Sequence, residues 1–261
     1  MEILTFKLIA VVAIFLTGLA GGLLSRWLSA TSRSETLFSM GNAFAGGVFL
    51  GAGLIHMLPD AQEGFSTLEA GSDYPWFGLV CCAGFLFILF LEKVLVHHQH
   101  SHDDDSALVT DNLSLYPYVL MIVLSIHSII TGIALGTEAR LVQAGVILIA
   151  VLAHKGTAAF ALGVTMMRGK VPMGRVMRMI ALFSFMTPLG ILMGIGLMKA
   201  LSGRAESMFE AGFDALAAGS FLYVALLDIL QEEFSREHHH FKKFILVLAG
   251  LAVMAVVAIW T

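Results

Sequence analysis

Eight long apolar runs account for most of the chain, and they constrain its fold more than any other feature of the sequence. They cover residues 4–28, 38–60, 76–96, 116–136, 141–166, 176–200, 210–231 and 241–260. Each run is long enough to cross the ~30 Å hydrocarbon core of a bilayer as a helix. The runs are apolar nearly all round, whereas the helices of a soluble protein would each show a polar face. We therefore predict an all-α integral membrane protein, a bundle of eight transmembrane helices that forms a single domain over residues 1–261.

The charge content agrees with a lipid environment. Only 13% of the 261 residues are charged, against about 25% in a soluble domain. The formal net charge of −4 gives no reason to expect a nucleic-acid partner. The lipid bilayer is the expected partner, and we expect a multi-pass protein of the cell membrane.

The basic residues predict how the bundle is oriented. Arg and Lys gather in the loops after the first, fifth and seventh runs: Arg26, Arg33, Arg168, Lys170, Arg175, Arg178, Arg236, Lys242 and Lys243. The loop from Asp60 to Pro75 carries Glu63, Glu69 and Asp73 and no basic residue. Because basic loops stay in the cytoplasm, the odd-numbered loops are predicted to be cytoplasmic and both termini outside.

Two histidine clusters lie on the predicted cytoplasmic side. The polar loop at about 97–115 holds His97, His98, His100 and His102, and the loop before the last run holds His238, His239 and His240. Histidine-rich tracts bind divalent transition metals through neutral imidazole. We interpret both clusters as candidate cytoplasmic metal-binding segments; the alternative is that they are solvated loops whose histidines bind nothing.

Two further histidines lie inside the apolar runs, where imidazole is costly and usually lines a pathway. Counting from the ends of their runs places His127 and His154 about 14–20 Å deep, near the bilayer midplane. Their runs are antiparallel and joined by a short loop, so the two rings are predicted to meet, with the Ser128 and Thr131 hydroxyls nearby. Imidazole pairs suit Zn²⁺ or Fe²⁺ better than Mg²⁺ or Ca²⁺. The alternative is that each histidine only hydrogen-bonds a neighbouring helix.

Five motifs, in order along the chain, carry a resemblance to a known family. They are HMLPD at 56–60, HSIITGIALG at 127–136, HKGTAAFALG at 154–163, TPLG at 187–190 and FLYVALLD at 221–228. Together they resemble the signatures of the ZIP (Zrt/Irt-like) family of divalent-metal transporters. The resemblance implies a pathway between the second, fourth, fifth and seventh spans, with His127 and His154 as the central ligands. It implies His56 and Asp60 near the outer mouth and Asp228, with Glu232 and Glu233, near the inner exit.

The resemblance also implies a function. We expect a secondary transporter, not an enzyme, that moves divalent transition-metal ions into the cytoplasm, with zinc first and iron, manganese or cadmium as alternatives. The metal is cargo, and no prosthetic cofactor is expected. Many ZIP members have a Glu four residues after one or both histidines, where this chain has Thr131 and Ala158. Lys155 stands where some relatives have an Asp that helps to hold a second metal, so a two-metal centre is not expected.

Two alternatives remain open. The missing carboxylates could mark a ZIP-like metal sensor or scaffold that has lost transport, and a membrane metalloenzyme would need a general base that the central site does not offer. The sequence leaves the oligomeric state open, with a homodimer as one arrangement.

Overall fold

The computed structural model describes residues 2–68, 74–96, 116–197 and 204–259, and apart from short turns between the helices this part of the chain is helical. Eight helical stretches of the described part are long and apolar enough to cross a membrane, in the predicted order, so the predicted fold class is confirmed. The histidine-rich segment predicted at about 97–115 lies outside the described residues. The elements are α1 (Glu2–Ser29), α2 (Ser34–Gly51), η1 (Ala52–Met57), α3 (Leu58–Leu68), α4 (Trp76–Leu89), η2 (Phe90–Val96), α5 (Tyr116–Thr137), α6 (Leu141–Arg168), α7 (Met173–Leu197), α8 (Arg204–Tyr223), η3 (Val224–Leu230), α9 (Gln231–Ser235) and α10 (His240–Val257).

The second span is longer than predicted. The sequence predicts that it ends at residue 60, but the helix continues through α3 to Leu68. Asp60 therefore lies in the first turn of α3 and is followed by two further turns. This extension is stabilised by packing against α8, where Ala61 is fully buried and Gly64 lies against Ala211.

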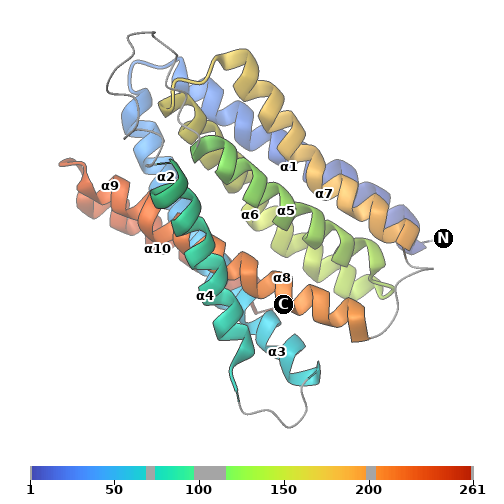
Figure 1. Cartoon of the computed structure of the whole chain (residues 1–261). Coiled ribbons are helices and arrows are strands. Elements are labelled where there is room, and N and C mark those ends of the chain that lie inside the picture. Colours follow the sequence, from blue (N-terminus) through green and yellow to red (C-terminus); the bar gives the residue numbers. More distant parts are fainter. Residues whose placement is uncertain (1, 69–73, 97–115, 198–203, 260–261) are drawn as a thin grey trace, which may run out of the picture.

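The helices form two bundles side by side (Figure 1). We call α1, α5, α6 and α7 the histidine bundle, because α5 carries His127 and α6 carries His154. We call the remaining elements the π-helix bundle, because η1, η2 and η3 are π-helical segments within it. The most extensive helix–helix contacts of the molecule lie within one bundle or the other: α5 with α7 and α1 with α6, and α2 with α10 and α4 with α8.

Glycines set the close crossings inside the histidine bundle. A side chain at Gly132 or Gly136 of α5 would collide with the backbone of α7 at Gly190 and Gly194, respectively. Small residues spaced by four allow such close approach of helices in lipid. Gly156 of α6 packs in the same way against Gly21 of α1. The small-residue faces of α5 and α6 thus pack against α7 and α1, and not against each other.

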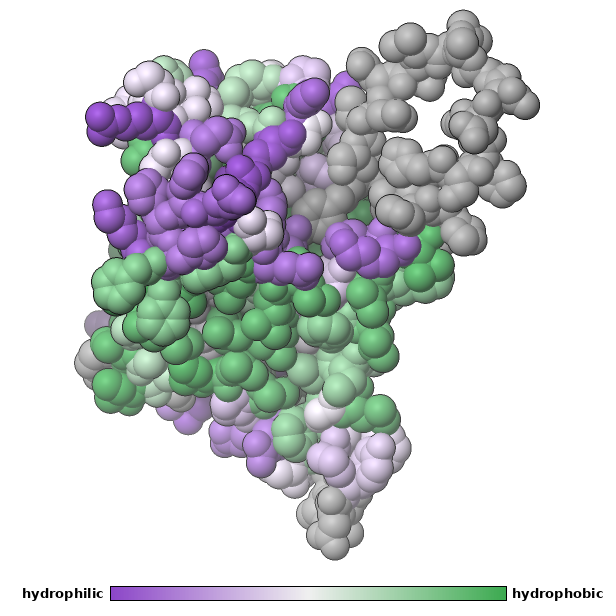
Figure 2. All heavy atoms as spheres, turned by 90° about the vertical axis from the view of Figure 1, so that its left-hand side faces the viewer, coloured by the Kyte–Doolittle hydropathy of each residue, from purple (hydrophilic) through white to green (hydrophobic). Residues whose placement is uncertain are grey.

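The surface agrees with a membrane-spanning bundle. Figure 2 shows a continuous hydrophobic band between two hydrophilic ends of the molecule. We call the end that carries Arg33, Arg175 and Arg236 the basic end. The α1, α6 and α8 elements run between this end and the opposite one, and the start of α1 and the end of α10 both lie opposite the basic end, as an even number of spans requires (Figure 1). Whether the basic end faces the cytoplasm stays a prediction.

Candidate metal site

The two intramembrane histidines face each other at mid-depth. His127 is the twelfth residue of α5 and His154 the fourteenth of α6, so each lies roughly 16–20 Å from the start of its helix. Their ring centroids are 5.9 Å apart, and both side chains are buried. Because a zinc–imidazole bond is about 2.0 Å long, the ring centres of two histidines on one ion lie roughly 5–6 Å apart. The pair is therefore spaced for one shared ion.

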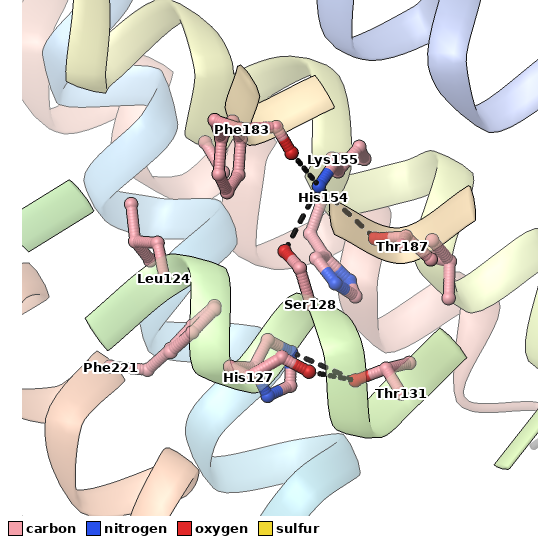
Figure 3. Close-up of a pocket in the computed structure, with 11 residues that line it drawn as sticks. Leu124, His127, Ser128, Thr131, His154, Lys155, Phe183, Thr187 and Phe221 are labelled. Carbon is pink, nitrogen blue, oxygen red and sulfur yellow. Dashed lines mark hydrogen bonds between the residues drawn. The ribbon is translucent and has the colours of Figure 1, made fainter. Parts of the chain in front are cut away.

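A small cavity lies between the histidines and the neighbouring helices (Figure 3). It leaves about 10 Å³ for the centre of a water-sized particle, which is room for about one such particle. Its walls come from α5, α6, α7 and α8: Leu124, His127, Ser128, Thr131, Val151, His154, Lys155, Ala158, Phe183, Thr187 and Phe221. The cavity therefore accommodates a single ion and not a larger solute.

Some of the polar atoms around the histidines already take part in hydrogen bonds within the protein. The Thr131 hydroxyl donates to the His127 carbonyl at 3.0 Å and lies 3.3 Å from His127 Nε2. The Ala150 carbonyl, one turn before His154, interacts with its ring, but no well-formed hydrogen bond reaches the buried Nδ1 within the described part of the chain. A buried ring nitrogen without a full hydrogen bond is costly. The imidazole donates toward the Ala150 carbonyl through one nitrogen, which leaves its other nitrogen to coordinate an ion.

Lys155 is turned away from the space between the histidines, as Figure 3 shows. Its ammonium donates to the Ser128 hydroxyl at 2.9 Å, the Phe183 carbonyl at 3.0 Å and the Thr187 hydroxyl at 3.1 Å. It also lies 3.7 Å from the centre of the Phe183 ring. All three protons of the ammonium therefore have acceptors, and this one side chain ties α6 to α5 and α7. Ser128, a predicted ligand, is bound to Lys155 in this arrangement.

Phe221 is a site residue that sequence reasoning missed. It comes from α8 of the π-helix bundle, whereas the other cavity walls belong to the histidine bundle. Its ring makes an edge contact with His127 at 4.9 Å and lies 6.1 Å from His154. Phe49 of α2 packs against its other side at 5.0 Å. Phe221 therefore covers the histidine pair where the two bundles meet. The FLYVALLD motif contains it, but an apolar residue in an apolar run gives no signal of its own.

His56 and Asp60 form a separate pair in the other bundle. His56 lies in η1 and its Nδ1 is 3.0 Å from an Asp60 carboxylate oxygen one turn later. The side chains are 16% and 42% exposed, respectively, so exposure falls from Asp60 through His56 to the buried His127 and His154. His56 lies within electrostatic range of both of those histidines and of Asp214. Asp60 is thus the most exposed of these four side chains, and His127 and His154 are the least exposed.

The other predicted residues lie apart from the central pair. Asp228 lies in η3, within electrostatic range of the buried Tyr223, and does not line the central cavity. His238, His239 and His240 are exposed near the basic end; the first two rings are 6.3 Å apart and the third packs against Phe234. His97, His98, His100 and His102 lie outside the described residues. Within the described ranges, no three histidine, cysteine or acidic side chains cluster closely enough to hold one ion.

Comparison with known proteins agrees with this geometry. A profile of the ZIP zinc transporter family matches residues 4–114 and 96–258. The zinc transporter ZIP2 of Mus musculus is 30% identical over 89% of this chain and 88% of its own length. The zinc transporter ZIP1 of Takifugu rubripes is 28% identical over 97% of each chain, and ZIP1 of Homo sapiens is 29% identical over 85% of this chain and 78% of its own. The similarity thus extends along nearly the whole chain, and the chain belongs to the ZIP zinc transporter family.

Proposed function

We propose that the chain is a secondary transporter that carries divalent transition-metal ions, zinc first, across the membrane into the cytoplasm. The observation that carries the proposal is the buried pair of imidazoles, 5.9 Å apart at mid-depth, beside a cavity that accommodates one ion. Burying imidazole inside a bilayer costs free energy, and such residues usually line a pathway for an ion or substrate. Neutral imidazole selects zinc and its neighbours over magnesium and calcium. The relatives that cover the chain are zinc transporters by name, which supports zinc as cargo.

In this proposal His127 and His154 are the central ligands. Thr131 adds a hydroxyl and water completes the coordination shell, while His56 and Asp60 receive the ion at the outer mouth and Asp228 lies near the exit. A site with two imidazoles and no adjacent carboxylate holds an ion weakly. Weak holding suits a carrier, because the same site must release its cargo.

One observation favours the second candidate, a metal sensor or scaffold without transport. The described residues contain no cluster of three ionisable ligands, and a carrier with too few ligands captures too little metal to move. A sensor would bind zinc with no net movement across the membrane, so uptake separates the two candidates.

The deciding experiment is uptake of radiolabelled zinc into vesicles that contain the purified protein. We expect uptake in the native protein and near-complete loss in His127→Ala and in His154→Ala, because either change removes half of the nitrogen ligands. The double variant should be little worse than either single one. Ser66→Ala, on the exposed side of α3, is the control for the effects of mutagenesis, purification and reconstitution. It should transport zinc at the native rate. Zinc binding without uptake by the native protein would establish the sensor, and unchanged uptake in both folded histidine variants would exclude the central pair.

A further inference from the structure

A cluster of six charged side chains lies at the basic end of the molecule. Its members are Glu35 of α2, Arg168 of α6, Glu232 and Glu233 of α9, Arg236 just after α9, and Lys243 of α10. Three positive and three negative groups make it neutral as a whole. None of these residues belongs to the proposed metal site.

Glu233 is the buried centre of this cluster. Its side chain is fully buried; it accepts hydrogen bonds from the Ser39 hydroxyl at 2.5 Å and the Asn42 amide at 3.2 Å. Lys243 donates to the Glu233 carbonyl, and its ammonium lies 3.9 Å from the carboxylate. All these partners belong to the π-helix bundle. Its own bundle therefore holds the Glu233 charge in place.

Arg168 is the single member that comes from the histidine bundle. It ends α6, the helix that carries His154, and its Nη1 donates to Glu233 at 2.7 Å and to Glu232 at 3.2 Å. Its Nη2 lies 3.8 Å from Glu35. Arg168 therefore spans the boundary between the two bundles.

The remaining members stay paired without Arg168. Arg236 binds Glu232 at 2.6 Å and Glu35 at 3.4 Å, and Glu233 keeps Ser39, Asn42 and Lys243. Arg168 itself is incompletely satisfied: its Nε and Nη2 are buried and form no hydrogen bond within the described residues. Burying a charge with unmade hydrogen bonds offsets much of what the ion pair contributes. The contact can therefore break without leaving an unpaired carboxylate behind.

The boundary that Arg168 crosses has a packed hydrophobic centre, where Phe49 and Phe221 join the same buried cluster as Leu124 and Ala158, and open grooves beside it. A groove of about 440 Å³ separates α1 and α6 from α2, and one of about 140 Å³ lies between α5 and the α4–α8 pair. Next to the ion cluster, Phe38 of α2 packs on Phe160 and Val164 of α6. At this end, the charge-assisted hydrogen bonds of Arg168 add to the Phe38 contact in holding the two bundles together.

We propose that Arg168, bound to Glu232 and Glu233, is a latch that holds the basic end of the pathway closed and must release before an ion can leave there. The inference rests on the proposed transport function, because any carrier must expose its site to the two sides in turn. Arg168 touches no ion in this proposal. It positions α6 against α2 and α9, and its release lets the histidine bundle separate from them at the basic end.

The test measures access to the central cavity without any metal. A cysteine replaces Ala158, which lines that cavity, in a protein whose Cys81 and Cys82 are changed to alanine. Sealed vesicles of either orientation are treated with a small, charged thiol reagent, and the rate of modification is measured from each side. Adding Arg168→Gln should raise the rate from the basic side about tenfold or more, since hydrogen bonds to charged groups have that weight. The rate from the opposite side should fall.

Arg236→Gln is the matched control. It removes the same kind of side chain from the same two carboxylates, Glu35 and Glu232, but all of its partners lie in one bundle. It should leave both rates unchanged. Arg168→Lys keeps the charge but reaches fewer acceptors, so it should raise the basic-side rate by a smaller factor, and it provides the test if Arg168→Gln does not fold.

Two results would overturn the latch. One is an unchanged basic-side rate in folded Arg168→Gln or Arg168→Lys. The other is a rise from both sides at once, which means general loosening of the structure. Because no metal is present, a failure of zinc uptake in the native protein would overturn the proposed function and leave the labelling result intact.

Discussion

At the scale of single residues, Lys155 is the side chain whose position changes most how the site is understood. A positive charge next to a cation site should repel the cargo, and the sequence predicts that it prevents a second metal from binding. In the structure the ammonium has its own three acceptors and faces the Ser128–Thr187 side of the cavity. It therefore contributes to helix packing as well as to the electrostatics of the site.

These two roles predict effects of opposite sign in Lys155→Met. Removing the hydrogen bonds among α5, α6 and α7 should lower the free energy of unfolding by about 1–3 kcal/mol. Removing the positive charge should raise zinc affinity, by about tenfold or more in a poorly solvated site. Thermal unfolding in detergent, with and without zinc, measures both. Lower stability together with weaker zinc binding would contradict the electrostatic role.

At the scale of helices, the glycine crossings determine which helices are paired. Gly132 and Gly136 bring α5 against α7, and this pairing also brings Thr187 and the Phe183 carbonyl within reach of Lys155. The end of α5 that lies opposite the basic end is held by another contact of this bundle, in which the Lys7 ammonium of α1 donates to the Gly136 carbonyl at 2.6 Å. The geometry of the site thus depends on backbone contacts one or two turns away.

Two glycines of α7 offer a matched comparison. In Gly190→Ala the added methyl meets the Ile129 carbonyl of α5, so we expect a loss of about 1–3 kcal/mol of stability from overpacking. In Gly196→Ala the methyl meets nothing within 4 Å, and the better helix former should stabilise the protein by up to about 1 kcal/mol. The melting temperatures of the two variants, each compared with that of the native protein, test these opposite changes in stability. Equal shifts would mean that the α5–α7 crossing is looser than described.

At the scale of the whole molecule, the two ends of the bundles carry different polar groups toward the two sides of the membrane. The ion cluster of Arg168 lies at the basic end, and the His56–Asp60 pair lies toward the other. The assignment of mouth and exit therefore depends on which end faces the cytoplasm.

Labelling of engineered cysteines tests that orientation in cells. In a background without Cys81 and Cys82, Ser72→Cys should react with an impermeant thiol reagent applied from outside. Ser101→Cys should react after permeabilisation only. The basis is the distribution of Arg and Lys among the loops. The reverse pattern would exchange the mouth and the exit, and the latch would then close the outer side.

The sequence predicts much of this architecture, and what it fails to predict has a physical cause. The depth of His127 and His154 follows from helix rise and span ends alone, so their meeting was predictable. The position of Phe221 against them was not, because hydrophobic runs do not encode which lipid-spanning helix packs opposite. Asp60 was placed at a helix end, because a polar stretch was interpreted as a loop, although its packing on α8 keeps it helical. The pairing of Arg168 with Glu233 joins residues 65 apart, a relation that no local pattern carries.

The fixed position of Lys155 also has an electrical consequence. Its ammonium is bound to α5 and α7 as well as to its own helix, so the histidine bundle carries a resident positive charge near the middle of the bilayer. Moving one elementary charge across the whole membrane against a voltage of 100 mV costs about 2.3 kcal/mol. If the proposed inward transport moves this bundle along the field, an inside-negative voltage opposes the outward return of the empty carrier. In that proposed cycle, the voltage slows the step in which no cargo moves.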